Sequence, residues 1–305
     1  MGIAFIGHPH FSSRLALEFQ SRGYRTIMLD YNEWGHNFFT SIKAVNNYQV
    51  LHFISGTGYR KLFYALVLRF ILGKKILVHF VGSDVTRMKT RKYLDRINWM
   101  GALKLAHRVF CVSPWLRDEL KPYGDSESFA LFFKNYTFKP MMLPETFTIL
   151  SYIPEARPEF YGKSIVEKLI IANPQFNFII LGGSDLSHYS NVECHTIDYN
   201  MDMIPFYNRT SVLLRLTEHD GLSNMVMESL AMNRHVVWTY DFPYVHQTEK
   251  EFKKVQKLII KLHNNNLPNT SAEWMQNHFD YTLFLNTLEA MYKNPKEPVP
   301  EELYS

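Results

Sequence analysis

Short runs of almost wholly apolar residues alternate with segments of helical spacing along most of the chain. In the first part of the sequence the apolar runs are 2–7, 24–31, 50–56, 75–82 and 109–114. Segments of helical spacing lie at 12–23, 94–108 and 115–124. Strands that are apolar throughout are typical of a parallel sheet covered by helices on both faces. The alternation therefore predicts an α/β fold.

A second alternation follows a break at 125–147, where Pro140 and Pro144 stand among scattered polar residues. Apolar runs return at 146–153, 176–183, 192–198, 211–216 and 235–238, and the last helical segments are 248–263 and 270–293. We predict two doubly wound Rossmann-like domains, residues 1–140 and 141–305, with the last helix free to pack back on the first domain. Two such domains in series predict a cleft outside the carboxyl ends of both sheets.

The two halves of the chain carry opposite net charges. Residues 1–139 contain 20 Lys and Arg against 9 Asp and Glu, whereas residues 140–305 contain 13 against 20. A basic half favours an anionic lipid, a phosphate-bearing acceptor or nucleic acid, with a merely solvated basic surface as the alternative. No signature of a nucleic-acid-binding module occurs, so we expect no nucleic-acid partner.

Several classes of protein are disfavoured by patterns that the sequence lacks. No apolar run reaches the ~18 residues of a membrane span, and the first residues do not read as a signal peptide. Cys111 and Cys194 are the only cysteines, which favours a reducing compartment. Neither HExxH nor CxxC occurs, and no GxGxxG follows the first strand, so we expect neither a metal nor a cofactor. We predict a cytoplasmic protein.

One carboxylate stands inside a long run of small and apolar residues. Glu228 is the only charged residue in segment 221–233, within a helix expected to begin near Ser223. That helix is apolar around most of its circumference, so it should be buried, and an ionised carboxylate there needs a partner. Two interpretations are open: a buried ion pair with Arg215 or Arg234, or recognition of ligand hydroxyls by the carboxylate oxygens.

The N-terminus of the same helix is a candidate anion site. Free backbone N–H groups and the helix dipole favour a phosphate there. Gly221, in the loop before the helix, allows a ligand to approach the backbone closely. This single element therefore predicts contacts with a sugar, a ribose and a diphosphate.

The segment 218–237, EHDGLSNMVMESLAMNRHVV, resembles the donor-binding segment of retaining glycosyltransferases of family 4, which have the GT-B fold. Two acidic residues separated by seven others mark that segment, and Asp220 and Glu228 stand at these positions. The resemblance implies that Glu228 binds the nucleotide ribose and that Asp220 is a catalytic residue facing the transferred sugar. It also implies donor contacts from Gly221, Leu222, Ser223 and Asn224.

Other segments of the chain are similar to the same family, in the same order. They are RGYRTIMLD at 22–30, VGSDV at 81–85, AHRVFCVSPWLRDEL at 106–120 and FNFIILGG at 176–183. The last of these resembles the strand that precedes the pocket for the nucleotide base.

The family resemblance places cations for the donor diphosphate near residues 152–163. Only Arg157 and Lys163 occur there. A guanidinium offers a fork that matches phosphate oxygens, so we predict a catalytic role for Arg157 and a donor-binding role for Lys163. A surface position in the proline-flanked loop is the alternative for Arg157.

Residues after two strands of the first domain are candidates for the acceptor side. His8 and His10 follow the first strand, and Ser83 and Asp84 follow the strand at 75–82. The resemblance implies that both loops face the acceptor. Solvation explains the two histidines equally well, and a helix cap explains Asp84.

The segment 58–75 mixes aromatic and aliphatic residues with Arg60, Lys61, Arg69, Lys74 and Lys75. A packed crossover helix with basic ends is the simpler interpretation. Apolar and basic residues together also bind anionic lipid, so peripheral contact with the inner face of a membrane is the alternative.

The sequence thus predicts a metal-independent retaining glycosyltransferase of glycan biosynthesis. Its substrates would be a nucleotide-diphosphate sugar and a hydroxyl of a glycan, with lipid-linked or cell-surface glycan precursors among the acceptors. The alternative is a nucleotide-sugar-binding subunit of a glycosyltransferase complex, without catalysis of its own.

Overall fold

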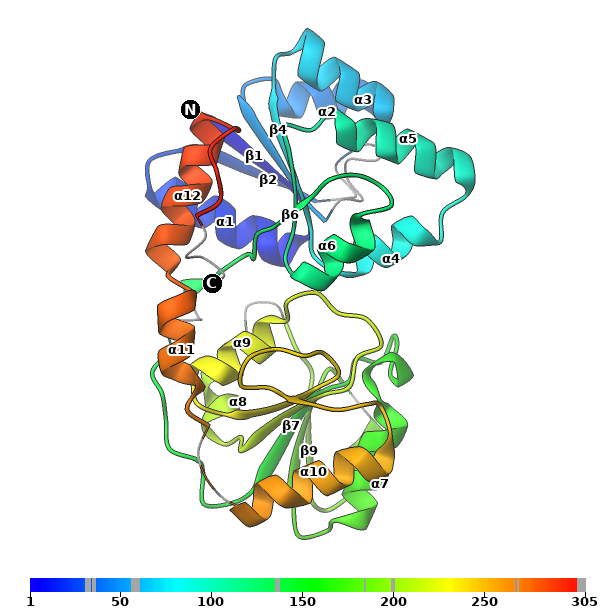
Figure 1. Ribbon diagram of the computed structural model, residues 1–305, viewed down its shortest axis with the longest axis vertical. Helices are drawn as coiled ribbons and strands as arrows, with labels where there is room; N and C mark the ends of the chain where they lie inside the picture. Colours follow the sequence, from blue (N-terminus) through cyan, green and yellow to red (C-terminus); the bar gives the residue numbers. More distant parts are fainter. Residues whose placement is uncertain are drawn as a thin grey trace. The chain divides into compact units, whose positions relative to one another are not determined.

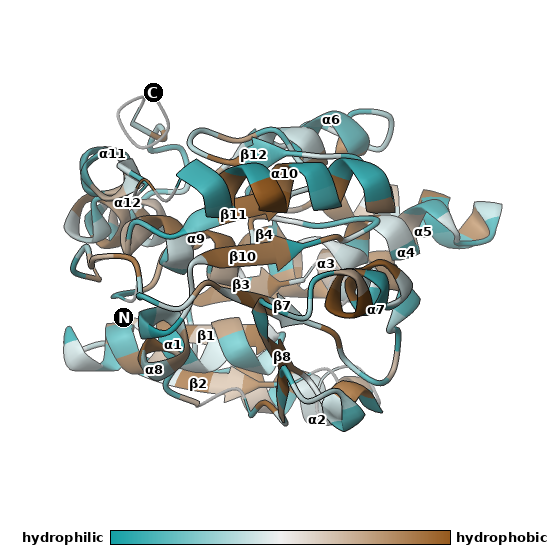
Figure 2. Ribbon diagram, turned by 90° about the horizontal axis from the view of Figure 1, so that it is seen from below, coloured by the Kyte–Doolittle hydropathy of each residue, from teal (hydrophilic) through white to brown (hydrophobic). Residues whose placement is uncertain are grey.

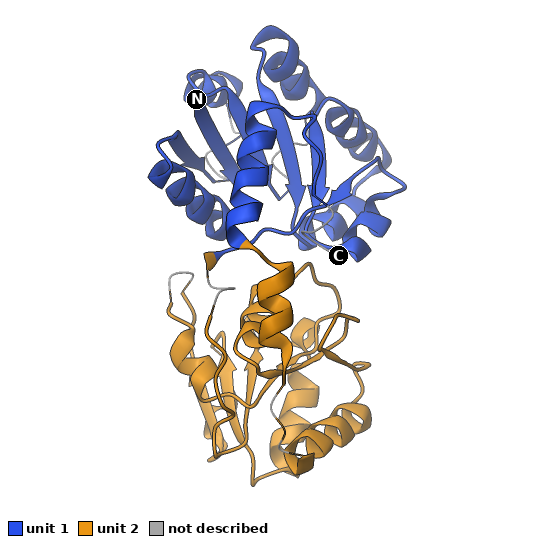
Figure 3. Ribbon diagram, turned by 60° about the vertical axis from the view of Figure 1, so that its left-hand side comes forward, with its two compact units in different colours: residues 1–133, 281–305 blue, residues 134–280 orange. Residues whose placement is uncertain are grey.

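The computed structural model describes residues 1–30, 34, 37–55, 61–134, 138–183, 185–198, 201–265, 267 and 269–300. The chain divides into two compact units (Figure 3). Unit 1 consists of residues 1–133 together with 281–305, and unit 2 of residues 134–280.

Unit 1 is built on a six-stranded parallel sheet with the order β2-β1-β3-β4-β5-β6 (Figure 1). The strands are β1 (Gly2–Gly7), β2 (Arg25–Leu29), β3 (Val50–Ile54), β4 (Lys75–Phe80), β5 (Arg108–Cys111) and β6 (Glu127–Ser128). The helices are α1 (Pro9–Ser21), α2 (Phe38–Val45), α3 (Leu62–Leu66), η2 (Val67–Ile71), α4 (Ser83–Lys89), α5 (Tyr93–Lys104), α6 (Pro114–Leu120) and α12 (Tyr281–Lys293).

The central strands of this sheet are apolar because both faces are covered. Every residue of β1 and β3 is buried. β1 ends at Gly7, whose φ of 137° lies in the region that favours glycine, and a Cβ there would stand 1.8 Å from the Ile54 carbonyl oxygen. The loop after β1 therefore leaves the sheet in direct contact with β3.

Unit 2 repeats the architecture with the order β12-β11-β10-β7-β8-β9. The strands are β7 (Thr148–Tyr152), β8 (Asn177–Leu181), β9 (Val192–His195), β10 (Val212–Arg215), β11 (His235–Trp238) and β12 (His246–Gln247). The helices are η4 (Glu159–Tyr161), α7 (Lys163–Ala172), η5 (Asp185–His188), α8 (Ile204–Asn208), α9 (Asn224–Ala231), α10 (Phe252–Asn265) and α11 (Ser271–His278). Figure 2 shows the hydrophobic residues concentrated on the central strands. The two parallel sheets confirm the predicted α/β class.

The observed units begin and end at other residues than the predicted domains, but the last helix packs on the first unit, as the sequence allowed. The first segment of unit 1 ends at residue 133 rather than 140, and the chain returns to unit 1 at Tyr281. The helix predicted over 270–293 is two helices, because Phe279 leaves helical geometry with φ −126° and ψ 60°.

The second of these helices, α12, belongs to unit 1 because its apolar face packs there. The ring of Phe284 lies 5.5 Å from that of Phe129, and the ring of Tyr292 lies 5.0 Å from that of Phe19, between centroids. Phe284 and Tyr292 are fully buried.

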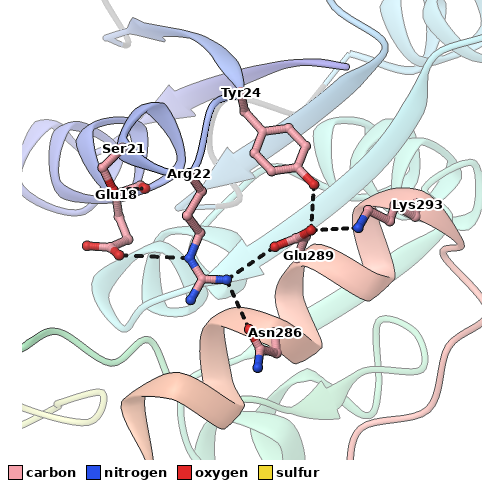
Figure 4. Close-up of polar contacts among 7 residues, drawn as sticks. All are labelled: Glu18, Ser21, Arg22, Tyr24, Asn286, Glu289 and Lys293. Carbon is pink, nitrogen blue, oxygen red and sulfur yellow. Dashed lines mark hydrogen bonds and ion pairs between the residues drawn. The ribbon is translucent and has the colours of Figure 1, made fainter.

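A polar cluster fixes the outer side of α12 (Figure 4). The Glu289 carboxylate accepts hydrogen bonds from the Tyr24 hydroxyl at 2.6 Å, from Arg22 Nη1 at 3.2 Å and from Lys293 Nζ at 2.6 Å. Arg22 Nη1 also donates to Asn286 Oδ1 at 3.0 Å. The hydrogen bonds from Lys293 and Tyr24 lower the pKa of Glu289 to about 2.

Glu289→Gln should lower the free energy of unfolding by about 1–2 kcal/mol, because it replaces charge-assisted hydrogen bonds with neutral ones. The depressed pKa means that this contribution is present above the unfolded-state pKa, near 4.3, and is lost as the pH falls toward about 2. Urea unfolding at pH 7 and pH 3 measures both effects. Equal losses at the two pH values would contradict the role of the charge.

Three basic residues of segment 58–75 bond backbone carbonyls of unit 1, whereas Lys61 is exposed, with its Nζ 4.8 Å from the centre of the Tyr64 ring. Lys74 Nζ donates to the Asn46 carbonyl at 2.5 Å, and Lys75 Nζ donates to the Tyr292 carbonyl at 3.2 Å. Arg69 Nη1 donates to the Leu105 carbonyl at 2.6 Å. Arg60 lies outside the described residues. These contacts support the packed crossover segment, seen here as α3 and η2.

No described helix combines the length and the apolar character that crossing a membrane would require.

Candidate functional site

The strand order reverses once in each sheet, and each reversal places two loops side by side at the carboxyl edge. In unit 2 the chain moves from β7 to β8 on one side and returns to β10 on the other. In unit 1 the reversal lies between β1 and β3. Ligands of doubly wound sheets bind at such switch points, outside the carboxyl ends of the strands.

A pocket of about 420 Å³ opens at this edge of unit 2, beside the ends of β7 and β8. It is lined by Ile153, Glu155, Pro158, Lys163, Gly183 and Asp185. Gly183 has φ 80°, and a Cβ there would lie 2.9 Å from Glu155 Oε1. The glycine turn after β8 therefore keeps this pocket open where a side chain would enter it.

Two further pockets lie at the opposite edges of the sheets. One of about 550 Å³ surrounds Thr148, Asn177 and Val192, the first residues of β7, β8 and β9. Another of about 380 Å³ surrounds Arg108 and Glu127, the first residues of β5 and β6. Because ligands of this architecture bind at carboxyl ends, we assign the functional site to the 420 Å³ pocket.

Lys163 lines the pocket but already has a partner. Its Nζ lies 2.6 Å from Asp185 Oδ1 across the mouth. The hydrogen bond that Lys163 donates to the Asp185 carboxylate raises the pKa of Lys163 and lowers the pKa of Asp185. The side chain of Asp185 is mostly exposed, so this pair is screened by water.

Arg157 lies in the loop after β7 and is exposed. Its guanidinium carbon stands 4.7 Å from the centre of the Phe160 ring. The structure thus places Arg157 at the predicted edge of the sheet, stacked on an aromatic ring.

Asp220, in the loop after β10, is held by Arg215. Arg215 Nε and Nη2 donate to the two carboxylate oxygens at 2.5 and 3.0 Å. The Thr217 hydroxyl donates to Oδ2 at 3.2 Å, and the Asp220 backbone N–H donates to the Tyr240 hydroxyl at 3.0 Å. The two charged side chains are only 12% and 13% exposed. Asp220 therefore anchors this loop to the end of its own strand.

Arg215 was not predicted to be a residue of the binding site. It ends β10, and its guanidinium carbon stands 5.8 Å from the centre of the Tyr161 ring. Burial lowers its pKa, but the Asp220 carboxylate outweighs burial and the pKa is raised. An arginine that closes an apolar strand is the sequence signal that would have singled it out.

The loops after β7 and β10 are joined at two points. A Cβ on Gly162 would lie 2.8 Å from Leu216 Cβ, so the loops pack without a side chain between them. Lys250 Nζ donates to the Glu159 carbonyl at 2.5 Å and to Glu218 Oε1 at 3.0 Å. Lys250 gives no sequence signal, because it lies 91 residues from Glu159 and 32 residues from Glu218, in a charged segment.

Glu228 lies in α9 and is 4% exposed. Its Oε2 accepts a hydrogen bond from the Tyr207 hydroxyl at 2.5 Å, and Tyr207 is fully buried in α8. Arg215 is bound to Asp220, and Arg234 Nη1 donates to the Met142 carbonyl at 2.7 Å. The interpretation of Glu228 as the ion-pair partner of Arg215 or Arg234 was therefore wrong, because Arg215 binds Asp220 and Arg234 donates to the Met142 carbonyl.

The start of α9 is not capped by a side chain. Ser223 is its N-cap and makes no side-chain cap bond, and the first turn, which begins at Asn224, contains no acidic residue. Gly221 and Ser223 are buried, whereas Leu222 and Asn224 are half-buried. The positive end of the helix dipole thus stands beside the loop that Asp220 anchors.

In unit 1, His8 is the N-cap of α1 and its N–H donates to the Ile54 carbonyl at 3.0 Å. The pKa of His8 is lowered, chiefly by burial. The nearby Asp84 opposes this shift, and Arg87 adds to it. The loop after β1 therefore meets the start of α4, and His10 packs its ring 6.0 Å from that of Phe133.

Asp84 is fully buried and caps the turn that opens α4. Its Oδ1 accepts from the backbone N–H groups of Gly82 at 2.9 Å and Val85 at 3.1 Å, and Oδ2 accepts from that of Val81 at 3.1 Å. The neighbouring Ser83 is exposed. These contacts support the cap interpretation of Asp84 and leave Ser83 at the surface of the carboxyl edge.

Among the residues that the structure describes, no group of three or more His, Cys, Asp or Glu side chains could hold a metal ion.

Comparison with protein-family models found no match, and comparison with curated proteins found none either. Solved structures with the same fold do exist. Sucrose-phosphate synthase from Thermosynechococcus elongatus superposes with a TM-score of 0.76 at 13% identity, over 97% of this chain and 99% of that one. The glycotransferase of kitacinnamycin gives 0.57 at 12% identity, over 90% and 93% of the two chains.

A UDP-GlcNAc 2-epimerase from Neisseria meningitidis, solved with bound UDP-GlcNAc, gives a TM-score of 0.53 at 11% identity, over 87% of this chain and 92% of that one. At these identities the likeness concerns the fold. The two α/β units of this chain therefore have the GT-B fold that glycosyltransferases share with UDP-GlcNAc 2-epimerases.

Proposed function

We propose that this chain is a retaining glycosyltransferase that moves a sugar from a nucleotide-diphosphate donor to an acceptor hydroxyl. The observation that carries the proposal is the buried Glu228 carboxylate, held by Tyr207 on the helix that follows the switch-point strand β10. A fold shared with proteins described as glycosyltransferases supports it.

We assign each part of the donor to a part of unit 2. The 420 Å³ pocket takes the nucleotide base, since its glycine wall lets a flat ring approach the backbone. Glu228 accepts hydrogen bonds from the ribose hydroxyls, since the two oxygens of a carboxylate can each accept more than one hydrogen bond. The dipole of α9 stabilises the departing diphosphate, which is electrostatic preorganisation.

The charges around the pocket also bear on a second candidate function. Lys163 is paired with Asp185, and Arg215 is paired with Asp220. Two cations near the diphosphate position are thus neutralised within the protein, which favours a nucleotide-sugar-binding subunit without turnover. In the transferase proposal the cation that contacts the diphosphate is Arg157, whose exposed side chain can move away from the Phe160 ring.

Glu228→Gln should weaken the binding of a nucleoside diphosphate by about 1–3 kcal/mol, the usual range for hydrogen bonds to a charged acceptor. Isothermal titration of the purified chain with UDP, GDP and ADP first identifies the base and then measures the loss. The matched control is Glu273→Gln, which removes the same charge from an exposed position on α11. If the parent and Glu228→Gln bind the nucleoside diphosphate with equal affinity, Glu228 does not bind the ribose.

The activity is tested on the chain alone with a panel of labelled nucleotide sugars. Slow donor hydrolysis, with release of the diphosphate and the sugar, is expected of a transferase without its acceptor. Binding without any turnover would show that the chain is a nucleotide-sugar-binding subunit. Conversion of the nucleotide sugar to its epimer would show that it is an epimerase. We further propose that turnover persists in a chelator, and that the acceptor is a glycan or a lipid-linked precursor.

A further inference from the structure

The 550 Å³ pocket of unit 2 lies at the edge of the sheet opposite to the candidate functional site. It surrounds the amino ends of β7, β8 and β9, whereas the 420 Å³ pocket lies beside the carboxyl ends of β7 and β8. β7 and β8 have five residues each, so at about 3.3 Å per residue the two edges are roughly 17 Å apart. One small ligand therefore cannot occupy both pockets. The larger pocket falls within the range of about 300–1,000 Å³ that is usual for small-molecule sites.

Three asparagines line this second pocket: Asn177, Asn191 and Asn208. Asn177 is the first residue of β8, and the Phe178 N–H donates to the Asn191 carbonyl at 2.9 Å, so the first two lie on adjacent segments. Asn208 is the last residue of α8. An amide side chain has two N–H donors and an oxygen acceptor. Three amides around one space therefore suit a ligand that both donates and accepts hydrogen bonds.

The protein itself uses these amides only in part. Asn191 Nδ2 donates to the Phe176 carbonyl at 3.0 Å, which fixes that side chain. Asn208 Oδ1 is buried and has no hydrogen-bond donor among the described residues. A buried acceptor without a donor costs about 1–3 kcal/mol, so folding alone does not explain an amide at this position. Because the last torsion of an asparagine is soft, a small rotation turns this oxygen toward a hydroxyl in the pocket.

The charges of the pocket disfavour an anionic ligand. Its charged residues among those described are Glu145, Glu193 and Arg209. Arg209 Nη1 donates to Glu193 Oε1 at 3.1 Å and Nη2 donates to Oε2, so the arginine is already neutralised. Two acids against one arginine leave a net charge of −1, carried by the exposed Glu145. A phosphate or a nucleotide is therefore repelled, whereas a neutral ligand is not.

Hydroxyl and apolar groups complete the lining. Thr146 and Ser190 are exposed and offer hydroxyls, and Pro144 and Val192 are half-buried and apolar. A sugar ring has hydroxyls around its edge and C–H groups on its faces. It can therefore use the polar and the apolar walls together.

We propose that this pocket binds a neutral sugar ring. We call it the asparagine pocket and define it by Asn177, Asn191 and Asn208. The amides exchange hydrogen bonds with neighbouring hydroxyls of the sugar. The proposal goes beyond sugar transfer, since binding here is measured without any nucleotide, and either proposal can fail alone.

The test is saturation-transfer-difference NMR on the purified chain with methyl α-glucoside, methyl α-galactoside, methyl α-mannoside and N-acetylglucosamine. We expect at least one of the four to bind with a Kd of about 1 mM, since a few neutral hydrogen bonds must offset the cost of association. The 6-phosphate of that sugar should bind about tenfold more weakly, because a dianion then faces a net charge of −1. UDP should not displace the neutral sugar.

Variants of two asparagines locate the bound sugar. Asn177→Ala/Asn208→Leu should weaken its binding about tenfold, at roughly threefold for each neutral hydrogen bond lost. Asn208→Leu alone should weaken binding about threefold without lowering the free energy of unfolding of the sugar-free chain, because leucine removes the unpaired acceptor and keeps the size of the side chain. A purely structural role of Asn208 would lower that free energy instead. The control Gln276→Ala/Asn277→Ala removes two exposed amides from α11 and should bind as the parent does.

Four results would overturn the proposal. The first is that none of the four sugars binds, and the second is that the 6-phosphate binds as tightly as the neutral sugar. The third is displacement of the sugar by UDP, which would place it in the 420 Å³ pocket. The fourth is an equal effect of the asparagine-pocket variants and the control on sugar binding.

Discussion

Arg215→Met should lower the free energy of unfolding by about 3 kcal/mol, because it leaves the Asp220 carboxylate without its cation in a place where both side chains are nearly buried. The two hydrogen bonds of the pair, at 2.5 and 3.0 Å, are lost together. Methionine keeps most of the side-chain volume, so the lower free energy of unfolding does not come from a cavity. Urea unfolding followed by circular dichroism gives the value.

A double-mutant cycle separates the pair from its surroundings. Asp220→Asn alone should cost a similar amount, because it leaves the guanidinium uncompensated. The double variant Arg215→Met/Asp220→Asn should cost clearly less than the sum of the two, with a coupling of about 2 kcal/mol. Additive losses would mean that the two side chains stabilise the protein independently.

The same variants decide what Asp220 does in the proposed transferase. A residue that only contacts the transferred sugar would, when changed, depress turnover and leave diphosphate affinity intact. A residue that anchors the loop before α9 should depress both in parallel, since the loop positions the N-terminus of that helix. The contacts of Asp220 with Arg215 and Thr217 lead us to expect the parallel loss.

The sheet of each unit could be predicted because its strands are apolar on both faces. The runs that became β1, β3 and β4 are continuous in the sequence, and all but Lys75 at the start of β4 are buried in the structure. Turn glycines such as Gly7 mark where they end. Local patterns are enough here because burial on both faces leaves a signal in every strand residue.

The division of the chain could not be read in the same way. Phe284 and Tyr292 fit the core of either unit by their composition, and only the rings of Phe129 and Phe19 show which one they join. The return of α12 to unit 1 therefore depends on contacts across more than 150 residues of sequence. Helical spacing predicts that a segment is helical but does not predict its partner.

The site shows the same contrast. The isolation of Glu228 in an apolar run predicted a buried carboxylate correctly, because burial of a charge is visible as a break in the pattern. Its partner, Tyr207, comes from a different helix, and a tyrosine gives no sign of what its hydroxyl bonds to. Arg215 was one of two arginines considered as an ion-pair partner of Glu228, but it binds Asp220, since the choice between the two acids depends on the course of the loop.

Unit 1 should lose about 5 kcal/mol of stability between pH 6.5 and pH 4.5 through two buried histidines. His52 on β3 and His79 on β4 are fully buried, with ring centroids 5.6 Å apart. Burial lowers the pKa of His79 to about 3 and holds that of His52 well below its usual value, with His79 lowering it further. The unfolded chain takes up both protons near pH 6.5 while the folded chain does not, so the stability is present above that pH and is lost as the pH falls.

The slope of the unfolding free energy against pH tests this assignment. His79→Gln keeps an N–H donor for the Phe129 carbonyl, to which His79 Nε2 is bonded at 2.6 Å, and removes one titrating ring. It should make the slope shallower by about 1.4 kcal/mol per pH unit between pH 6 and 5, whatever it costs at pH 8. The window lies above the range in which Glu289 acts, and His263→Gln, at an exposed position on α10, is the control. An unchanged slope in His79→Gln would assign the acid sensitivity to other histidines whose pKa values burial lowers, such as the half-buried His107 and the buried His235.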